Sequence, residues 1–240
     1  MTLEKISIIT ICLNDAAGLD KTMASLACQQ FKDFECIVID GGSNDGSIDI
    51  IKKYSAIVTY WTSEPDSGIY NAQNKGIIKS TGEYCLFLNS GDYLADENVL
   101  QKVIDDKSDA DILYGDMLIE KGAGVSVIKK GPEKITLRKM LTDTIWHPVS
   151  FIQRNIFLKF GMYNEKYKIV GDYEFFLRVL MKEKVKTHYL NFTVSVFNLS
   201  GISSNPDYLK KQINERNSVQ DVYFNPILLA VYRLYGKIRS

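Results

Sequence analysis

Short apolar runs alternate with amphipathic segments along the first half of the chain. The apolar runs are rich in Ile, Val, Phe and Leu and predict strands at 6–13, 34–40, 57–61, 83–88 and 111–114. The segments between them predict helices at 19–30, 47–54, 67–79 and 96–105. Strands that are apolar on both faces and separated by short helices indicate an α/β fold, with a mostly parallel sheet flanked by helices.

This alternation ends after Gly115. The following pattern predicts a hairpin or loop at 122–131, strands at 151–153, 186–190 and 193–197, and helices at 136–141 and 172–184. From Tyr208 onward the chain has a helical pattern. The absence of any internal repeat favours one domain with a helical C-terminal elaboration.

Composition narrows the class of protein. The chain has 240 residues, with 29 Lys and Arg against 29 Asp and Glu, and 45% of its residues are hydrophobic. These values are typical of a globular domain and exclude a disordered or collagen-like chain. A net charge of zero gives no electrostatic reason to expect a nucleic-acid partner.

The cysteines and the short apolar runs bear on whether the protein is cytoplasmic or secreted. Cys12, Cys28, Cys36 and Cys85 form no CxxC pair, so we expect buried thiols and neither a disulfide framework nor a zinc site. The apolar run at 6–13 is too short to span a bilayer and has no basic segment before it. A cytoplasmic protein without a signal peptide is therefore expected.

Two turn-rich stretches directly follow predicted strands, at 40–46 and 89–92. In open α/β sheets ligands bind outside the carboxyl ends of the strands. Asp40 can accept a hydrogen bond from a base or a ribose, and the alternative is a plain turn residue. Asp92 can contact a divalent cation that bridges diphosphate oxygens, although a single Asp is little for a metal site.

A third polar stretch opens the predicted helix at 67–79. Asp66 or Ser67 can cap this helix, whose positive N-terminal end suits a phosphate group. Asn71 and Lys75 lie further along it, and Lys75 could offer a point charge to a diphosphate. The alternative is a solvated helix face.

The ordered set of motifs at 6–10, 13–14, 38–47, 68–76, 82–84 and 87–92 resembles a family 2 glycosyltransferase of GT-A fold. The resemblance covers roughly residues 5–200. It implies inverting transfer of a sugar from a nucleotide-diphosphate sugar, with UDP as the expected nucleotide, to an acceptor hydroxyl in bacterial surface polysaccharide or glycolipid synthesis. It divides the chain into a GT-A domain at 1–204 (nucleotide-binding part about 1–115, acceptor side about 116–204) and a helical segment at 205–240.

Carried over residue by residue, the resemblance places Thr10 and Asn14 in the nucleotide pocket and makes Asp40 the partner of the base. Its metal and diphosphate motif falls on residues 89–92. Acidic residues are usual in the family where this chain has Asn89 and Gly91, so Asp92 is the one carboxylate left for Mn²⁺ or Mg²⁺.

Two downstream residues complete the expected site. His147, in Trp-His-Pro, is expected to contact the diphosphate or complete the metal shell. Asp172 is, by resemblance, the general base that deprotonates the acceptor hydroxyl. The competing interpretation is that Asp172 caps its helix and Glu174 complements the helix dipole, with Glu174 as a second choice of base.

The C-terminal segment at 227–238 has one apolar helical face, bears Arg233 and Lys237, and no acidic residue follows Asp221. Such a helix can lie on an anionic membrane surface, which would suit a lipid-linked acceptor and a peripheral location at the inner face of the membrane. It can equally pack on its own domain or on a second subunit, and the oligomeric state is left open.

Two other functions compete with transfer. A sugar nucleotidyltransferase would need a basic glycine-rich loop after the first strand, and residues 12–18 contain no Lys or Arg. A nucleotide-sugar-binding protein without turnover would fit the depleted 89–92 motif.

Overall fold

The computed structural model describes residues 6–121, 125–183, 185–199, 201 and 204–238. Its strands are β1 (Ile6–Cys12), β2 (Phe34–Asp40), β3 (Val58–Ser63), β4 (Tyr84–Phe87), β5 (Tyr93–Leu94), β6 (Ile112–Glu120), β7 (Ser126–Lys129), β8 (Ser150–Gln153) and β9 (Thr187–Phe197). Its α-helices are α1 (Ala16–Ala27), α2 (Ser47–Lys53), α3 (Ile69–Lys79), α4 (Val99–Asp106), α5 (Leu137–Thr142), α6 (Arg154–Phe160), α7 (Gly171–Leu177), α8 (Leu209–Tyr223) and α9 (Pro226–Ile238). Single helical turns occur at η1 (His147–Val149), η2 (Arg178–Lys182) and η4 (Pro206–Tyr208).

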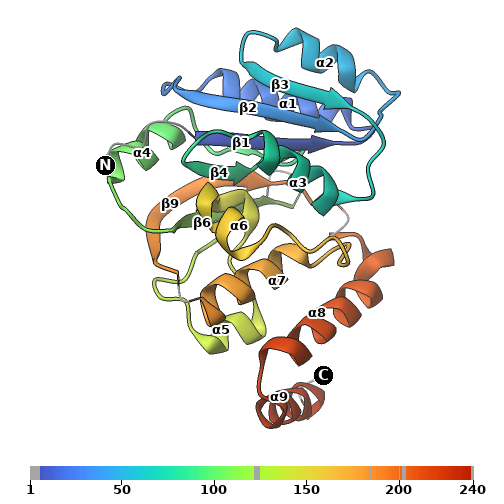
Figure 1. The fold of residues 1–240 in the computed structure, drawn as a ribbon, viewed down its shortest axis with the longest axis vertical. Coiled ribbons are helices and arrows are strands. Elements are labelled where there is room, and N and C mark those ends of the chain that lie inside the picture. The colour runs from blue at the N-terminus through green and yellow to red at the C-terminus, as the bar shows by residue number, and fades with distance from the viewer. Residues whose placement is uncertain (1–5, 122–124, 184, 200, 202–203, 239–240) are drawn as a thin grey trace.

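The strands form one sheet in the order β3-β2-β1-β4-β8-β6-β9-β5, with β7 added on β6. The pairs β1–β2, β2–β3 and β1–β4 are parallel, which confirms the predicted α/β arrangement of the first half. In the second half β8 pairs antiparallel with both β4 and β6, so the sheet is mixed beyond β4. The carboxyl ends of β1, β2 and β4 therefore share one edge, which faces right in Figure 1.

Two buried clusters cover the two faces of this sheet. Residues of β1, β2 and β4 alternate between the clusters, as the period of two in a strand requires. One face packs against α3, α6 and α7, and the other packs against α1, α2 and α4. This sandwich confirms the predicted helices on both sides of the sheet (Figure 1).

The second half differs from the expected elements in several places. The strands predicted at 186–190 and 193–197 are one strand, β9, with Asn191 at a φ of +50° between them. The helix predicted at 172–184 changes to a π-helical turn at η2, and residue 184 lies outside the described residues. In the stretch 122–131, β7 forms a hairpin with β6, while 122–124 are not described.

Two short elements had no clear signal in the sequence. The two-residue strand β5 forms only because β9 lies beside it, and α6 follows β8 without a preceding turn signal. Both depend on partners far away in the chain.

The C-terminal helices α8 and α9 extend to the end of the molecule opposite β3 (Figure 1). Val219, Phe224 and Leu229 join the cluster that contains α7, so part of this segment shares the core of the rest of the chain. Ile227 is 76% exposed and Leu234 is 61% exposed, which leaves an apolar face of α9 uncovered. Among the described residues, no helix is both long and apolar enough to cross a bilayer.

Candidate active site

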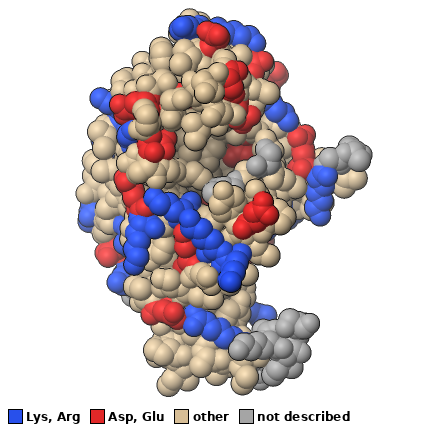
Figure 2. All heavy atoms as spheres, turned by 90° about the vertical axis from the view of Figure 1, so that its right-hand side faces the viewer, with Lys and Arg blue, Asp and Glu red and all other residues tan. Residues whose placement is uncertain are grey.

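A cavity of about 600 Å³ opens at the carboxyl edge of the parallel strands. Its wall comes from the β1–α1 loop, the start of α3, the β4–β5 loop, His147, the start of α7 and the end of β9. Figure 2 looks onto this edge and shows a hollow with acidic side chains at its margin and a band of Lys and Arg below it. Such a volume suits a small-molecule ligand.

Four polar side chains form a continuous hydrogen-bonded chain on the cavity wall. Gln73 Nε2 donates to Asn89 Oδ1 over 3.1 Å, and Asn89 Nδ2 lies 3.2 Å from His147 Nε2. His147 Nδ1 lies 3.2 Å from Asp172 Oδ2. Because an amide nitrogen only donates, His147 Nε2 accepts from Asn89, and Nδ1 carries the proton that faces Asp172. This places the imidazole in the orientation that supports a carboxylate at Asp172.

Asp172 is further held by its own segment. Tyr70 Oη lies 3.1 Å from Asp172 Oδ1 and 2.8 Å from the carbonyl of Ile169. The Tyr173 amide also donates to Asp172 Oδ1, over 2.9 Å. The Asp172 side chain is nevertheless 19% exposed and lines the cavity. It is therefore fixed in orientation and open to a ligand.

The electrostatic environment keeps Asp172 ionised. Burial by itself raises the pKa of this carboxyl, but the hydrogen bonds from His147 Nδ1, the Tyr173 amide and Tyr70 outweigh it, so the pKa lies below its ordinary value. The Asp172 carboxylate therefore does more than cap its helix: it also accepts a hydrogen bond from the imidazole of His147.

The pKa of Asp92, unlike that of Asp172, is raised by its surroundings. It is 3% exposed, and burial raises its pKa to about 6 despite a hydrogen bond from the backbone amide of Asn198. An isolated buried carboxylate is costly when ionised, and a cation beside it would relieve that cost.

The predicted metal pair is not arranged as a ligand set. Both His147 ring nitrogens already face other side chains, Asn89 and Asp172. Within the described ranges no group of three His, Cys, Asp or Glu side chains could hold a metal ion. Of the two predicted ligands, only Asp92 offers the carboxylate oxygens that Mg²⁺ prefers, and it lines the cavity.

Asn14, predicted to contact the nucleotide, lines the cavity and ties two loops together. The backbone N–H of Asn14 donates to Ser43 Oγ over 2.7 Å, and its side-chain Oδ1 accepts from the backbone N–H of Asn44 over 3.0 Å. A φ of +51° at Asn14 turns the chain at the end of β1, a conformation that Asn tolerates better than most residues.

Asp40, predicted to hold the base, is wholly buried and is not among the residues found on the cavity wall. One oxygen accepts from the amides of Gly42 and Ser43 at 3.0 and 2.8 Å and from Ser63 Oγ at 2.6 Å, and the other accepts from Ser43 Oγ at 2.5 Å. The structure therefore shows Asp40 organising the loop that carries Asn44.

Three other predicted donor-binding residues also lie off the described wall of the cavity. Thr10 is buried in the middle of β1, on the face toward α1. Asn71 donates to Glu165 over 2.9 Å, and Lys75 Nζ lies 2.7 Å from Glu64. Of the polar side chains of α3, Gln73 therefore lines the cavity, while Asn71 and Lys75 contact the carboxylates of Glu165 and Glu64.

Sequence reasoning missed several residues at the site. Tyr70 and Gln73 had no signal beyond helix spacing, since a Tyr or Gln in an amphipathic helix is usually structural. Lys168 was also missed: its Nζ donates to the Ser67 carbonyl over 2.8 Å and lies beside Gly68, which lines the cavity. The sequence pattern offers no signal for Lys168, whose neighbour Ile169 lies on the wall.

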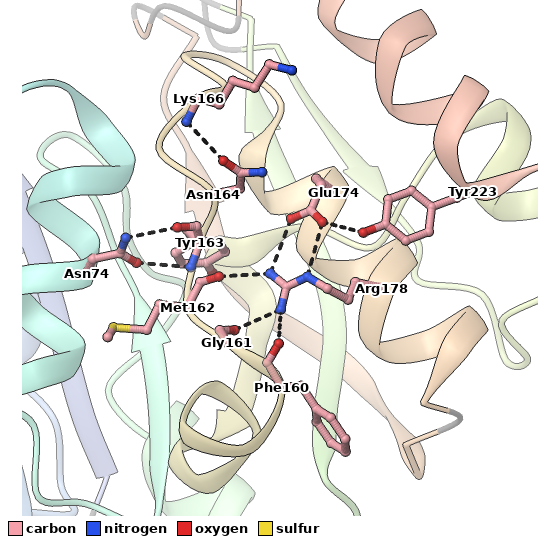
Figure 3. Close-up of polar contacts among 10 residues, drawn as sticks. All are labelled: Asn74, Phe160, Gly161, Met162, Tyr163, Asn164, Lys166, Glu174, Arg178 and Tyr223. Atoms are coloured by element: carbon pink, nitrogen blue, oxygen red, sulfur yellow. Dashed lines mark hydrogen bonds and ion pairs between the residues drawn. The ribbon is translucent and has the colours of Figure 1, made fainter.

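Glu174, the alternative base, has a structural role instead. Its carboxylate lies 3.1 Å from Arg178 Nε and also accepts from Tyr223 of α8 (Figure 3). The same guanidinium donates to the carbonyls of residues 160–162. Glu174 therefore neutralises an Arg that organises the α6–α7 loop, and Asp172 is the carboxylate at the start of α7 that reaches the cavity.

Comparison with known proteins identifies the family of this chain. The model of the family "Glycosyl transferase family 2" matches residues 7–188. A PGL/p-HBAD biosynthesis glycosyltransferase of Mycobacterium bovis (strain BCG / Pasteur 1173P2) is 30% identical over 213 residues, which cover 85% of this chain and 81% of the relative.

Solved structures share the fold. S. aureus TarS 1-349 in complex with UDP-GlcNAc has a TM-score of 0.69 at 20% identity, covering 85% of this chain and 62% of that chain. Mannosyltransferase PcManGT from Pyrobaculum calidifontis, in complex with GDP-Man and Mn²⁺, has a TM-score of 0.61 at 12% identity, covering 83% and 58%. The chain thus spans less than two thirds of either structure.

The parallel strands, the polar cavity at their carboxyl ends and the family match over most of the chain lead to one assignment. The chain belongs to glycosyl transferase family 2 and is a glycosyltransferase of GT-A fold that transfers a sugar from a nucleotide sugar.

Proposed function

We propose that this glycosyltransferase inverts the anomeric centre of a nucleotide-diphosphate sugar, with UDP as the nucleotide, and transfers the sugar to an acceptor hydroxyl. The single observation that carries the proposal is the Asp172–His147 pair on the cavity wall, 3.2 Å between Oδ2 and Nδ1. Direct displacement needs one general base, and this pair supplies an ionised carboxylate in a fixed orientation.

In this proposal Asp172 accepts the proton of the acceptor hydroxyl while that oxygen forms a bond to the anomeric carbon. The bond from that carbon to the diphosphate breaks on the opposite side, and the nucleoside diphosphate leaves with the bonding electrons. His147 donates to Asp172 through Nδ1 and keeps the carboxylate aimed at the cavity. The low pKa of Asp172 makes it a weak base but keeps it ionised at neutral pH.

The donor's diphosphate would lie between the start of α3 and the β4–β5 loop. Gly68 and Ile69 bring the positive end of α3 to the cavity, and Lys168 lies at its rim. A divalent cation, Mn²⁺ or Mg²⁺, would be held by Asp92 together with the phosphates and would neutralise charge on the leaving group. Asn14 and the loop organised by Asp40 would face the nucleoside.

For the acceptor, we propose a saccharide or lipid-linked hydroxyl of a bacterial surface polysaccharide or glycolipid. The uncovered apolar face of α9, with Ile227, Val231 and Leu234 exposed, favours a peripheral position at the cytoplasmic side of a membrane. Arg233 adds little to this surface, because its guanidinium lies 2.9 Å from Asp221.

The test is a thermal-shift panel of UDP, GDP, dTDP and CMP, each with and without Mn²⁺ or Mg²⁺, followed by transfer assays with the matching labelled donor. A nucleotide at about 100 times its Kd should stabilise the protein by about 2.7 kcal/mol. We expect the largest shift with UDP plus cation, and a product of inverted anomeric configuration by NMR. A retained configuration would contradict the mechanism, and a shift without any turnover would favour a nucleotide-sugar-binding protein.

A further inference from the structure

The carboxylate of Glu215, on α8, binds the backbone just before Asp172. Its oxygens accept from the amides of Lys168 at 3.1 Å, Ile169 at 2.9 Å and Val170 at 3.3 Å. Lys168 and Ile169 directly precede Val170, which is the N-cap residue of α7, and the first N–H groups of a helix lack partners within the helix. A carboxylate at this end also complements the helix dipole. A residue far along the chain thus caps the segment that carries the base.

This capped segment contacts the site directly. The Ile169 carbonyl and Asp172 Oδ1 lie 2.8 and 3.1 Å from the same hydroxyl, that of Tyr70. Ile169 itself lines the cavity. Any shift of residues 168–170 would therefore move both the wall of the cavity and the hydrogen bonds that orient Asp172.

Two more side chains of α8 contact Tyr173, the residue that follows Asp172. The Arg216 guanidinium lies 3.9 Å from the centre of the Tyr173 ring, and Gln220 Nε2 donates to Tyr173 Oη over 3.2 Å. Both side chains also donate to carbonyls at the end of α5: Arg216 to Asp143 over 2.9 Å and Gln220 to Leu141 over 3.0 Å. Gln220 is 2% exposed, so these contacts are interior ones.

We propose that α8 is part of the catalytic apparatus and that Glu215 is the positioning residue for Asp172. The inference depends on the proposed role of Asp172 as base. It assigns to the C-terminal helical segment a function in catalysis in addition to any contact with a membrane. Glu215 acts through the backbone of residues 168–170 and contacts no reacting atom.

The experiment compares E215Q with D221N in the full chain. Both variants remove one negative charge from α8, but the carboxylate of Asp221 pairs with Arg233 of α9. We expect E215Q to lower kcat by about 10- to 100-fold, the scale of a misplaced catalytic group, and to raise the donor KM by no more than about fivefold, the change expected for a displaced Lys168. D221N should keep both constants within about twofold.

A second readout does not need turnover. The chain has two histidines, so the Cε1–H signals of His147 and His188 can be followed separately by NMR. E215Q should shift the His147 signal, because Asp172 moves relative to Nδ1, and leave the signal of His188, which lies beside Asp106, in place. D221N should move neither signal.

A double-mutant cycle sharpens the test. Y70F removes the hydroxyl that joins Ile169 to Asp172, so its effect on kcat should be strongly non-additive with that of E215Q. If E215Q does not fold, Q220L removes the hydrogen bond to Tyr173 instead. This variant should likewise lower kcat by a larger factor than it changes the donor KM.

A wild-type kcat and an unmoved His147 signal in folded E215Q would overturn the inference, as would additive effects of E215Q and Y70F. If the wild-type protein transfers no sugar at all, the proposed function fails, and a shifted His147 signal in E215Q would still support the positioning contact.

Discussion

Two buried carboxylates at the ends of secondary-structure elements, Asp40 after β2 and Asp172 at the start of α7, behave in opposite ways. Asp40 has its oxygens occupied by Gly42, Ser43 and Ser63 and is 0% exposed. Asp172 keeps part of its side chain open to the cavity and has an imidazole partner.

The difference teaches what makes a carboxylate available for chemistry. Most of the hydrogen bonds to the Asp40 carboxylate are local, because apart from Ser63 the donors are Gly42 and Ser43 of the turn that follows. The Asp172 environment is assembled from distant segments that contribute Tyr70 and His147. A carboxylate whose own loop satisfies it stabilises the loop, and one held by distant donors can be oriented toward a ligand.

The largest expected effect is that of D172N. Loss of a general base typically lowers the rate by about 10²–10⁴-fold, while the neutral amide keeps the size of the side chain. We expect transfer to fall by this factor, with donor affinity in a nucleotide titration changed by less than about threefold. Transfer at the wild-type rate would exclude Asp172 as base.

The second effect concerns Asp92 and pH. The pKa of Asp92 is about 6 in the folded protein and has the ordinary value of 3.8 in the unfolded chain. Between about pH 4 and pH 6 the carboxyl is therefore protonated when the protein is folded and ionised when it is unfolded. The contribution of Asp92 to stability is therefore present below about pH 4 and is lost as pH rises through about 6.

In EDTA, D92N should therefore be more stable than wild type by up to about 3 kcal/mol at pH 7.5, with the difference vanishing near pH 4. Urea unfolding at several pH values measures this. UDP with Mn²⁺ should stabilise wild type but give D92N no cation-dependent gain. Equal stability of the two proteins at pH 7.5 would show that Asp92 is not strained by burial.

The third prediction separates the two carboxylates. D40N should lower the free energy of unfolding by about 1–3 kcal/mol, because buried donors lose a charged acceptor, while kcat per folded molecule stays near wild type. D49N, on the exposed surface of α2, is the control and should change stability by less than about 0.5 kcal/mol. Unchanged stability with weaker nucleotide affinity would instead support the sequence-based prediction that Asp40 holds the base.

The smallest expected effect is a change in the donor KM, which should occur on removal of Lys168 but not of Lys75. K168A should raise the donor KM by about fivefold, equivalent to about 1 kcal/mol for an exposed charge pair, and the effect should fade in high salt. K75A should leave KM unchanged, because Lys75 is paired with Glu64 away from the cavity. The reverse outcome would restore Lys75 as the cation that contacts the diphosphate.

Much of the first half was predictable because its signals are local. Apolar runs such as the one in β1 mark buried strands, and turn residues after β2 and β4 mark the carboxyl edge where the cavity lies. Of the predicted site residues, Asn14, Asn89, Asp92, His147 and Asp172 line the cavity, and the first three lie in the loops that follow β1 and β4.

The remaining site residues were not predictable from spacing. Nothing in the helix pattern of α3 says that Gln73 faces the cavity while Lys75 faces Glu64, since that depends on which side of α3 packs on the sheet. Similarly, β5 exists only through β9, and one strand replaces two where Asn191 adopts a left-handed conformation.

The ordered set of motifs carried the resemblance to the family. By itself the sequence also determined the α/β class, the parallel strands of the first half and the edge that carries the cavity. These depend on periodicity and turn chemistry within a few residues. Only the tertiary structure decided which carboxylate is free, which histidine nitrogen faces it and that Glu215 caps the segment before Asp172. Those outcomes depend on packing between distant segments, and a hydrogen bond exists only where both partners are brought within about 3 Å.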